Sequence, residues 1–531
     1  MKKYITVLIL VLFGLTSCED FLIEDPKGEP TNANFWKTET DVISATTALY
    51  IFNDFQGIYG RGMHLYSLVP SDDFVVGKPK SQIEEIKDFI TSGNGSYTRD
   101  IWPMHFIVVK RANDIIRNVP DLDISEDVKN FALGEAYFMR GLAYFQLSLL
   151  YGDNNSGGIP IIDETITEDF FIERPASVSS SYEFAAASFK KAATLLPYFD
   201  VANSERFGRP HKNAALGYLA RTHLHNAEFN TASWDAVITA CDQVINSNKN
   251  ALEANFEDAF KIVNNWGSEY LWSVPSNTIG GSMFAGASLE NKAWGKYNGW
   301  GYFAPTKELY DSYEANDARR DATLLAFGDE FEFFGSTRKY ASPNNLTGFQ
   351  LKKYLEPFGY ANAVELNPNG DHPSTNLNLP LLRYSHILLM KAEALIVKNG
   401  AGAGDTEINL IRARAGLAAK IGANLEDLKS ERRAEFAGEL LGRYEDLCRW
   451  GDVAKIKGAL HGKRHIGVEF DTEEGENQGF PVTSTDFTEN FPTTEVWQER
   501  SNFILETHRI WPIPANAIDT SKETLLQNKG W

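Results

Sequence analysis

Apolar side chains recur at helical spacing over residues 127–151, and this run constrains the fold more than any other feature of the chain. The positions are Phe131, Ala132, Ala136, Phe138, Met139, Leu142, Ala143, Phe145 and Leu149. Gly134 and Gly141 lie inside the same run, and each weakens a helix by about 1 kcal/mol relative to alanine. We therefore expect a helix whose small residues allow a neighbouring helix to approach closely and compensate by packing.

Further helices are predicted around this one. A partner helix is expected over residues 182–196, because Pro197 stops it. The other predicted helices form two pairs that resemble tetratricopeptide units, namely residues 212–228 with 233–246 and residues 381–398 with 405–419. The helical pairs therefore lie near 127–250 and 381–420.

The segment near 260–375 is rich in Gly, Asn, Pro and aromatic residues and is expected to be loop-rich. Within it, Tyr270, Trp272 and Val274 alternate with their neighbours, which predicts a half-buried strand. The predicted fold class is mostly α: an irregular tetratricopeptide-like helical-repeat scaffold with long loop-rich insertions and a few short strands. Loops on a rigid scaffold are where binding usually resides.

Length and charge exclude several classes of protein. The chain has 531 residues, enough for a large core without disulfides, and only three cysteines. Asp plus Glu outnumber Lys plus Arg by 71 to 51, for a net charge of −20, and no basic block is present. A nucleic-acid partner is therefore not expected. The only long apolar run is at the N-terminus, which excludes a multi-pass membrane protein.

The N-terminus has the form of a lipoprotein leader. Lys2 and Lys3 precede an apolar stretch over residues 5–15, which is too short to span a bilayer but suits a secretory signal. Small residues then lead into Cys18, as in the lipobox of bacterial lipoproteins. We predict a signal peptide over residues 1–17, lipidation of Cys18 and an acidic tether over residues 18–30. Residues 31–531 are predicted to form a single composite domain.

Several short motifs occur in a set order along the chain. The motifs are Asn34-Phe35-Trp36-Lys37-Thr38-Glu39, Met139-Arg140-Gly141-Leu142-Ala143-Tyr144-Phe145, Leu382-Arg383-Tyr384-Ser385, Glu431-Arg432-Arg433, Arg443-Tyr444-Glu445-Asp446-Leu447 and Trp511-Pro512-Ile513-Pro514. Each motif is weak alone, but the ordered set is specific and resembles the SusD/RagB family of outer-membrane lipoproteins.

The resemblance implies a lipid-anchored protein of the outer membrane that faces the cell exterior. Such a protein captures a glycan or another nutrient and delivers it to a SusC-like TonB-dependent transporter barrel, with no catalysis and no cofactor. Two alternatives stay open. One is a glycoside hydrolase, for which no carboxylate pair stands out. The other is a structural or assembly subunit of an outer-membrane complex.

Aromatic residues indicate where a glycan would bind. Four of the 11 tryptophans lie between residues 266 and 300. Flat aromatic rings offer a platform for the C–H face of a sugar with little rotamer entropy to lose. We predict that Trp294, Tyr297, Trp300 and Tyr302 bind ligand, the alternative for each ring being a place in the core. Trp272 is expected in the core.

A second candidate group of ligand-binding residues is Arg61 with Asp72 and Asp73, on a loop that includes Tyr59. Tyr97 is a further candidate of the same kind. The arginines of the segment 431–450 could indicate an anion-binding site. We expect instead that they pair with nearby carboxylates and hold the fold. Those carboxylates are Glu431, Glu435, Glu439, Glu445 and Asp446.

No catalytic or metal-binding residue is predicted. His223 and His225 point away from each other on a helix, which is poor metal geometry. The scattered loop carboxylates leave open whether a structural calcium ion is bound. Cys241 and Cys448 are expected to be buried thiols, and a disulfide between them in an exported protein stays open.

Overall fold

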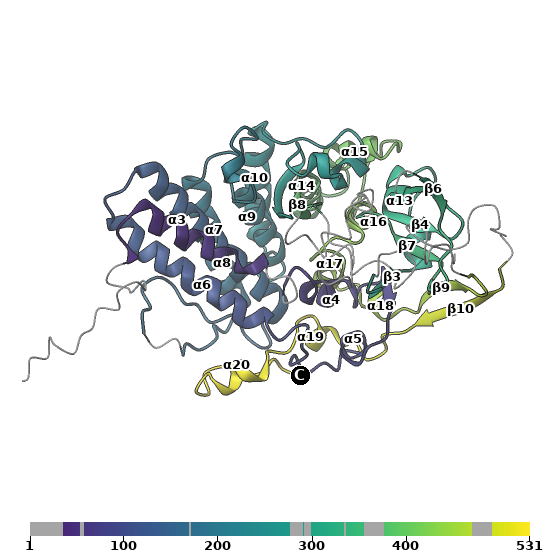
Figure 1. The fold of residues 1–531 in the computed structure, drawn as a ribbon, viewed down its shortest axis with the longest axis horizontal. Helices are drawn as coiled ribbons and strands as arrows, with labels where there is room; N and C mark the ends of the chain where they lie inside the picture. Colours follow the sequence, from purple (N-terminus) through teal and green to yellow (C-terminus); the bar gives the residue numbers. More distant parts are fainter. Residues whose placement is uncertain are drawn as a thin grey trace, which may run out of the picture.

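A row of helices forms one half of the protein, seen at the left of the computed structural model in Figure 1. Each helix packs against the next one along the chain, and the last packs against a helix from much later in the sequence. The row consists of α6 (Ile101–Asn118), α7 (Glu126–Tyr151), α8 (Val178–Leu195), α9 (Lys212–Asn226), α10 (Ser233–Asn246) and α14 (Tyr384–Asn399). The structure describes residues 35–53, 58–168, 171–276, 290, 299–333, 336–354, 376–469 and 491–531.

Shorter helices surround this row and the strands. They are α3 (Glu39–Thr47), α4 (Gly62–Leu68), α5 (Ser81–Lys87), α12 (Lys307–Asp311), α13 (Ala318–Thr323), α15 (Asp405–Arg414), α16 (Leu425–Phe436), α17 (Arg443–Trp450), α18 (Val453–Lys457), α19 (Leu505–His508) and α20 (Ala515–Asp519). Short 3-10 helices fill several connections, such as η2 (Ala48–Asn53) and η5 (Phe256–Phe260).

Among the described residues the strands form only two-stranded antiparallel sheets. The pairs are β1 (Phe74–Val76) with β3 (Phe303–Pro305), β2 (Tyr270–Val274) with β8 (Leu379–Arg383), β4 (Leu324–Ala326) with β7 (Phe349–Leu351), β5 (Glu330–Phe333) with β6 (Ser336–Lys339), and β9 (Leu460–His465) with β10 (Thr493–Gln498). The predicted fold class, mostly helical with a few short strands, is confirmed.

The glycines of α7 act as predicted. A Cβ atom on Gly134 would lie 2.7 Å from the side chain of Leu196, and one on Gly141 would lie 3.0 Å from the ring of Phe189. Both contacts come from α8 or the residue that caps it. The missing side chains therefore let α8 approach α7 closely, and the packing compensates for the low helix propensity of glycine.

Several predicted boundaries need correction. The helix predicted from residue 381 begins at Tyr384, because residues 379–383 form β8 and pair with β2. The helix predicted to end at residue 419 ends at Arg414, and Gly416 follows in the left-handed conformation with φ of +77°. The bounds of α10 and of β2 agree with the prediction.

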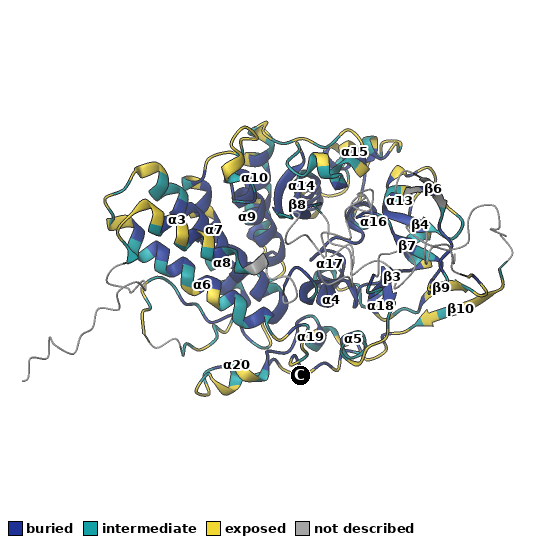
Figure 2. Ribbon diagram, in the orientation of Figure 1, coloured by how far each residue is buried: buried dark blue, intermediate teal, exposed yellow. Residues whose placement is uncertain are grey.

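The strand β2 is more deeply buried than predicted. Tyr270, Leu271, Trp272 and Ser273 are all buried, because one side of the β2–β8 pair contacts α9. Trp272 lies in the core, as expected, with its ring centre 4.7 Å from that of Phe138. The main apolar core is continuous and contains residues from Val42 to Leu525; Figure 2 shows buried residues running from the helical row through α14 and α17.

The described residues also answer questions about the cysteines and about membrane-spanning helices. Cys241 and Cys448 are buried and free, so the open question of a disulfide between them is answered in the negative. No described helix is long and apolar enough to cross a membrane. The predicted signal peptide, Cys18 and the tether lie outside the described residues.

Candidate ligand-binding site

Five side chains from separate segments meet near β1 and β3 and form what we call the aromatic–cation cluster. Arg61 precedes α4, Lys80 precedes α5, and Tyr97 lies in the loop before α6. Trp300 and Tyr302 precede β3. Three of these residues, namely Arg61, Trp300 and Tyr302, belong to the predicted ligand-binding set.

Arg61 is the centre of the cluster. Its guanidinium carbon lies 3.7 Å from the ring centre of Tyr97 and 5.3 Å from that of Trp300. Its Nη1 donates a hydrogen bond to the Tyr302 hydroxyl at 3.3 Å. A cation that close to an aromatic face is attracted by the negative ring face, and the attraction grows when water is excluded. Arg61 therefore holds the rings in a fixed arrangement.

The other contacts complete the group. Lys80 Nζ donates a hydrogen bond to the Tyr97 hydroxyl at 3.2 Å. The ring centres of Trp300 and Tyr302 are 5.4 Å apart, with their planes inclined by 41°. Trp300 and Tyr97 are half-buried and Lys80 is exposed, whereas Tyr302 is buried. The cluster therefore presents partly exposed rings beside a positive charge.

A close approach of two backbones builds the cluster. Val76 of β1 pairs with Phe303 of β3, and the next amide, Gly77 N, donates a hydrogen bond to Tyr302 O at 2.9 Å. A Cβ atom on Gly77 would lie 2.4 Å from the carbonyl oxygen of Gly301, which itself has φ of +63°. Only glycine fits at position 77 without moving the backbone, so these glycines allow the segments that carry Lys80 and Trp300 to meet.

The cluster rests on the helical row. Tyr59, two residues before Arg61, is buried, and its hydroxyl accepts a hydrogen bond from Gln146 Nε2 of α7 at 2.7 Å. Burial raises the pKa of Tyr59, so the hydroxyl stays neutral. The loop that carries Arg61 is therefore tied to a long helix of the core.

Burial and nearby charges shift the pKa values of the two phenols in opposite directions. Partial burial acts to raise the pKa of Tyr97, but the hydrogen bond from Lys80 and the charges of Lys80 and Arg61 outweigh it, so the pKa lies below the usual value. The pKa of Tyr302 is raised, chiefly by burial. Both hydroxyls can serve a ligand as hydrogen-bonding groups.

A cavity of about 200 Å³ adjoins Trp300. Its lining includes Lys78, Glu290 and Asn344. Glu290 Oε1 accepts a hydrogen bond from the Tyr340 hydroxyl at 2.7 Å, whereas Oε2 is buried and makes no hydrogen bond to any described residue. Burial raises the pKa of Glu290 to about 7. The cavity thus offers polar groups beside the ring of Trp300.

Asp72 and Asp73, which are also predicted to bind ligand, are buried, and each accepts a hydrogen bond from an arginine. Asp72 Oδ1 accepts from Arg443 Nε at 2.7 Å, and Asp73 Oδ1 accepts from Arg433 Nε at 2.8 Å. Burial acts to raise the pKa of Asp72, but the charges of Arg443 and Arg433 outweigh it and hold the pKa at about 2. These ion pairs give the two carboxylates a structural role.

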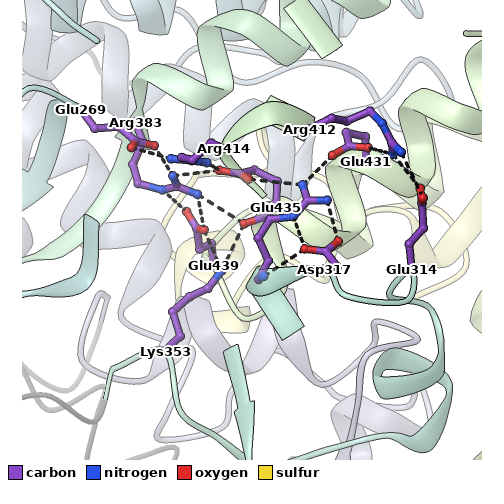
Figure 3. A network of polar contacts seen from close by, with 11 residues as sticks. Glu269, Glu314, Asp317, Lys353, Arg383, Arg412, Arg414, Glu431, Glu435 and Glu439 are labelled. Carbon is purple, nitrogen blue, oxygen red and sulfur yellow. Dashed lines mark hydrogen bonds and ion pairs between the residues drawn. The ribbon is translucent and has the colours of Figure 1, made fainter. Parts of the chain in front are cut away.

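A larger set of charged side chains forms what we call the buried ion network (Figure 3). Its residues are Glu269, Glu314, Asp317, Arg319, Lys353, Arg383, Arg412, Arg414, Glu431, Glu435 and Glu439. All of them except Glu314 and Arg414 are buried, and the side chain of Arg414 is 3% exposed. The single side chain of Arg383 forms three ion pairs, with Glu269, Glu435 and Glu439, the last at 2.6 Å.

The carboxylates of segment 431–450 hold the fold as expected, but most of their partners come from elsewhere. Glu431 binds Arg319 at 2.6 Å and Arg412 at 3.1 Å, both outside that segment. Asp446 pairs with Arg432 and Arg449 of the same segment, at 2.7 and 2.8 Å.

Glu445 was expected to pair with an arginine. It instead accepts a hydrogen bond from Ser67 Oγ at 3.1 Å, and no described cation forms an ion pair with it.

Three points remain about the site: predicted residues that the structure does not describe, residues that the sequence analysis missed, and metal binding. Trp294 and Tyr297 lie outside the described residues. Lys80 and Glu290 were not predicted, although the Lys78-Pro79-Lys80 motif after a glycine was a visible signal of exposed cations. Within the described part of the chain, no group of three His, Cys, Asp or Glu side chains is arranged to hold a metal ion.

Comparisons with known proteins give matches to family models and to related sequences. The sequence model of the SusD family matches residues 268–531, and a model described as "Starch-binding associating with outer membrane" matches residues 65–224. The chain is 27% identical over 495 residues to SusD-like protein P2 of Formosa agariphila, covering 86% of this chain and 91% of that protein.

Solved structures share the fold. A SusD-like protein from Bacteroides fragilis superposes with a TM-score of 0.72 at 22% identity, over 94% of this chain and 99% of that one. Surface glycan-binding protein A from Bacteroides thetaiotaomicron, solved in complex with laminarihexaose, gives a TM-score of 0.69 at 21% identity, over 92% and 99% of the two chains.

Proposed function

This chain belongs to the SusD/RagB family, and on that premise we propose that it binds glycans without cleaving them and passes them to a SusC-like TonB-dependent transporter. The observation that carries the proposal is the aromatic–cation cluster, in which Trp300 and Tyr97 are partly exposed and fixed by Arg61. The sugar would lie on these rings, and polar groups of the adjoining cavity would bind its hydroxyls.

The relatives support a glycan as the ligand. One structural neighbour is solved with laminarihexaose, and one family model carries starch binding in its description. Aromatic stacking tolerates different sugars, because every pyranose has a C–H face. Selectivity would come from the polar groups around the rings.

The binding test uses the full chain in detergent and affinity electrophoresis through gels that contain one polysaccharide each. We expect retardation by at least one glycan, loss of that retardation in Trp300→Ala and no low-molecular-weight product after long incubation. Trp497→Ala is the matched control, because Trp497 is 64% exposed on β10, outside the cluster. Equal retardation of Trp300→Ala and the parent protein would reject the cluster as the site, and released oligosaccharide would favour the glycoside hydrolase.

The membrane attachment and the partner need separate tests. We propose that Cys18 is acylated and anchors the chain at the outer surface of the outer membrane, since several acyl chains give effectively permanent anchoring. Labelled palmitate should enter the parent protein and not Cys18→Ala. Affinity purification from the native membrane should recover a β-barrel of the transporter type. Recovery of a barrel without any glycan binding would favour the structural subunit.

A further inference from the structure

The charge around the aromatic–cation cluster is opposite to the charge of the whole chain. The net charge is −20, yet the cluster and the adjoining cavity carry Arg61, Lys78 and Lys80. Lys78 and Lys80 are separated only by Pro79, and Lys78 is half-buried whereas Lys80 is exposed. A local positive patch can dominate what a protein attracts, whatever its net charge.

The two lysines differ from most cations elsewhere in the fold. No described carboxylate forms an ion pair with Lys78 or Lys80, whereas the buried cations Arg319, Arg383 and Arg414 each bind at least two carboxylates. The hydrogen bond of Lys80 goes to a neutral phenol, the hydroxyl of Tyr97. A neutral sugar placed over the rings would partly desolvate this charge without compensating it.

The carboxyl group of the cavity does not reverse this balance. Glu290 is buried, and one of its oxygens accepts from the Tyr340 hydroxyl. Burial raises the pKa of Glu290 to about 7, so a large share of the groups is protonated near neutral pH. In that form the buried carboxyl can donate a hydrogen bond to an oxygen of the ligand.

We propose that the glycan bound at this cluster is anionic, with a carboxylate or sulfate group that reaches Lys78 and Lys80 while a sugar ring lies on Trp300. The inference rests on the proposed function. Arg61 adds positive potential next to the rings, and the two lysines supply flexible donors. Charge-assisted hydrogen bonds from these lysines are about twice as strong as neutral ones and select for the charged sugar.

The test compares polysaccharides that differ only in charge. The probes are polygalacturonate against its methyl ester, and a sulfated galactan against the same galactan after desulfation. We expect the full chain to bind at least one charged member ten times more tightly than its neutral counterpart. Raising the salt concentration should weaken that binding and leave any neutral binding unchanged. The two pairs distinguish carboxylate from sulfate.

Charge variants locate the effect. Lys78→Gln combined with Lys80→Gln should reduce affinity for the charged member at least tenfold and bring it close to that of the neutral one. The matched control, Lys190→Gln with Lys191→Gln, removes the same charge from the exposed face of α8 and should change affinity less than twofold. Thermal unfolding of both variants should match the parent.

The outcomes separate the two proposals. Tighter binding of the neutral members, or an equal loss in both pairs of lysine variants, would overturn the anionic ligand and leave glycan capture standing. Failure of the parent chain to bind any of these probes or any neutral glycan would overturn both. Loss of charged binding only in the Lys78 and Lys80 variant supports the inference.

Discussion

The buried ion network and the aromatic–cation cluster use the same kind of cation in two different ways. In the network, Arg383 is fully enclosed and forms ion pairs with three carboxylates. In the cluster, the contacts of Arg61 include two aromatic rings and a phenol at a partly exposed site. The partners of a guanidinium and its burial therefore distinguish a role in folding from a role in binding.

Energetics make the same distinction. A buried ion pair contributes little compared with an apolar core, but removing one partner leaves an uncompensated charge and costs about 3–5 kcal/mol. A cation over an exposed ring contributes only about 0.5–1 kcal/mol. The network therefore tolerates no loss of a member, whereas the cluster can exchange protein contacts for ligand contacts at low cost.

The largest expected effect comes from Arg383→Met. This change leaves Glu269, Glu435 and Glu439 buried without that cation, and we expect the free energy of unfolding to fall by about 3–5 kcal/mol. Urea denaturation measures it. Arg61→Met is the matched change in the cluster and should cost less than about 1 kcal/mol. Equal losses in the two variants would contradict the contrast between the regions.

The next effect concerns Glu445, a buried carboxyl that accepts from Ser67 and has no described ion-pair partner. Burial raises its pKa to about 8 from a usual value of 4.5. Between these values the native state holds a proton that the unfolded chain has lost. Stability therefore falls as the pH rises through this window, by about 1.4 kcal/mol per pH unit.

Glu445→Gln should remove that slope, so that the variant gains stability over the parent as the pH rises from 5 to 8. Unfolding midpoints across this range measure the difference. Glu439→Gln should show no such gain, because Arg383 and Lys353 overcome the effect of burial and lower the pKa of Glu439. Parallel pH curves for Glu445→Gln and the parent would disprove the assignment.

A smaller effect is expected from Tyr97, whose ring and hydroxyl can be tested separately. Tyr97→Ala removes the ring under Arg61 and should weaken glycan binding about tenfold, or about 1.4 kcal/mol. Tyr97→Phe keeps the ring and loses the hydrogen bond from Lys80, so affinity should change about twofold. Calorimetric titration with a retained glycan measures both. Similar losses in the two variants would mean that the hydroxyl, and not the ring, carries the binding.

The smallest effect is expected at an exposed pair outside both regions. Lys463 Nζ lies 3.6 Å from Glu495 Oε1, and both side chains are more than half exposed. Lys463→Gln should change the free energy of unfolding by less than about 0.5 kcal/mol, because water and salt screen the pair. A loss above 1 kcal/mol in urea denaturation would show that exposed cations also support this fold.

The fold could be predicted where local pattern decides the structure. Residues 233–246 and 270–274 were predicted with the bounds that α10 and β2 have, because spacing and turn residues act within a few positions. The early end of α15 and the strand β8 were missed. The structure of β8 depends on a partner far away in the sequence, since residues 379–383 become a strand only by pairing with β2.

The site was predictable in part for the same reason. Trp300 and Tyr302 stood out by composition, and Arg61 by its glycine-rich loop. Asp72 and Asp73 have the same local appearance, but their partners Arg443 and Arg433 lie about 360 to 371 residues away. A sequence pattern cannot reveal that pairing. It also could not show that Lys80 would reach Tyr97.

The hydrogen bond between Arg61 and Tyr302 joins residues 241 positions apart. Contacts of such separation close a large loop and form slowly, after local helices. The rings can therefore assemble only when β3 has docked on β1, late in folding. A ligand that recognises the assembled rings binds the finished fold and not its precursors. It stabilises that fold in proportion to its occupancy, so an abundant ligand would also protect the protein from unfolding and proteolysis.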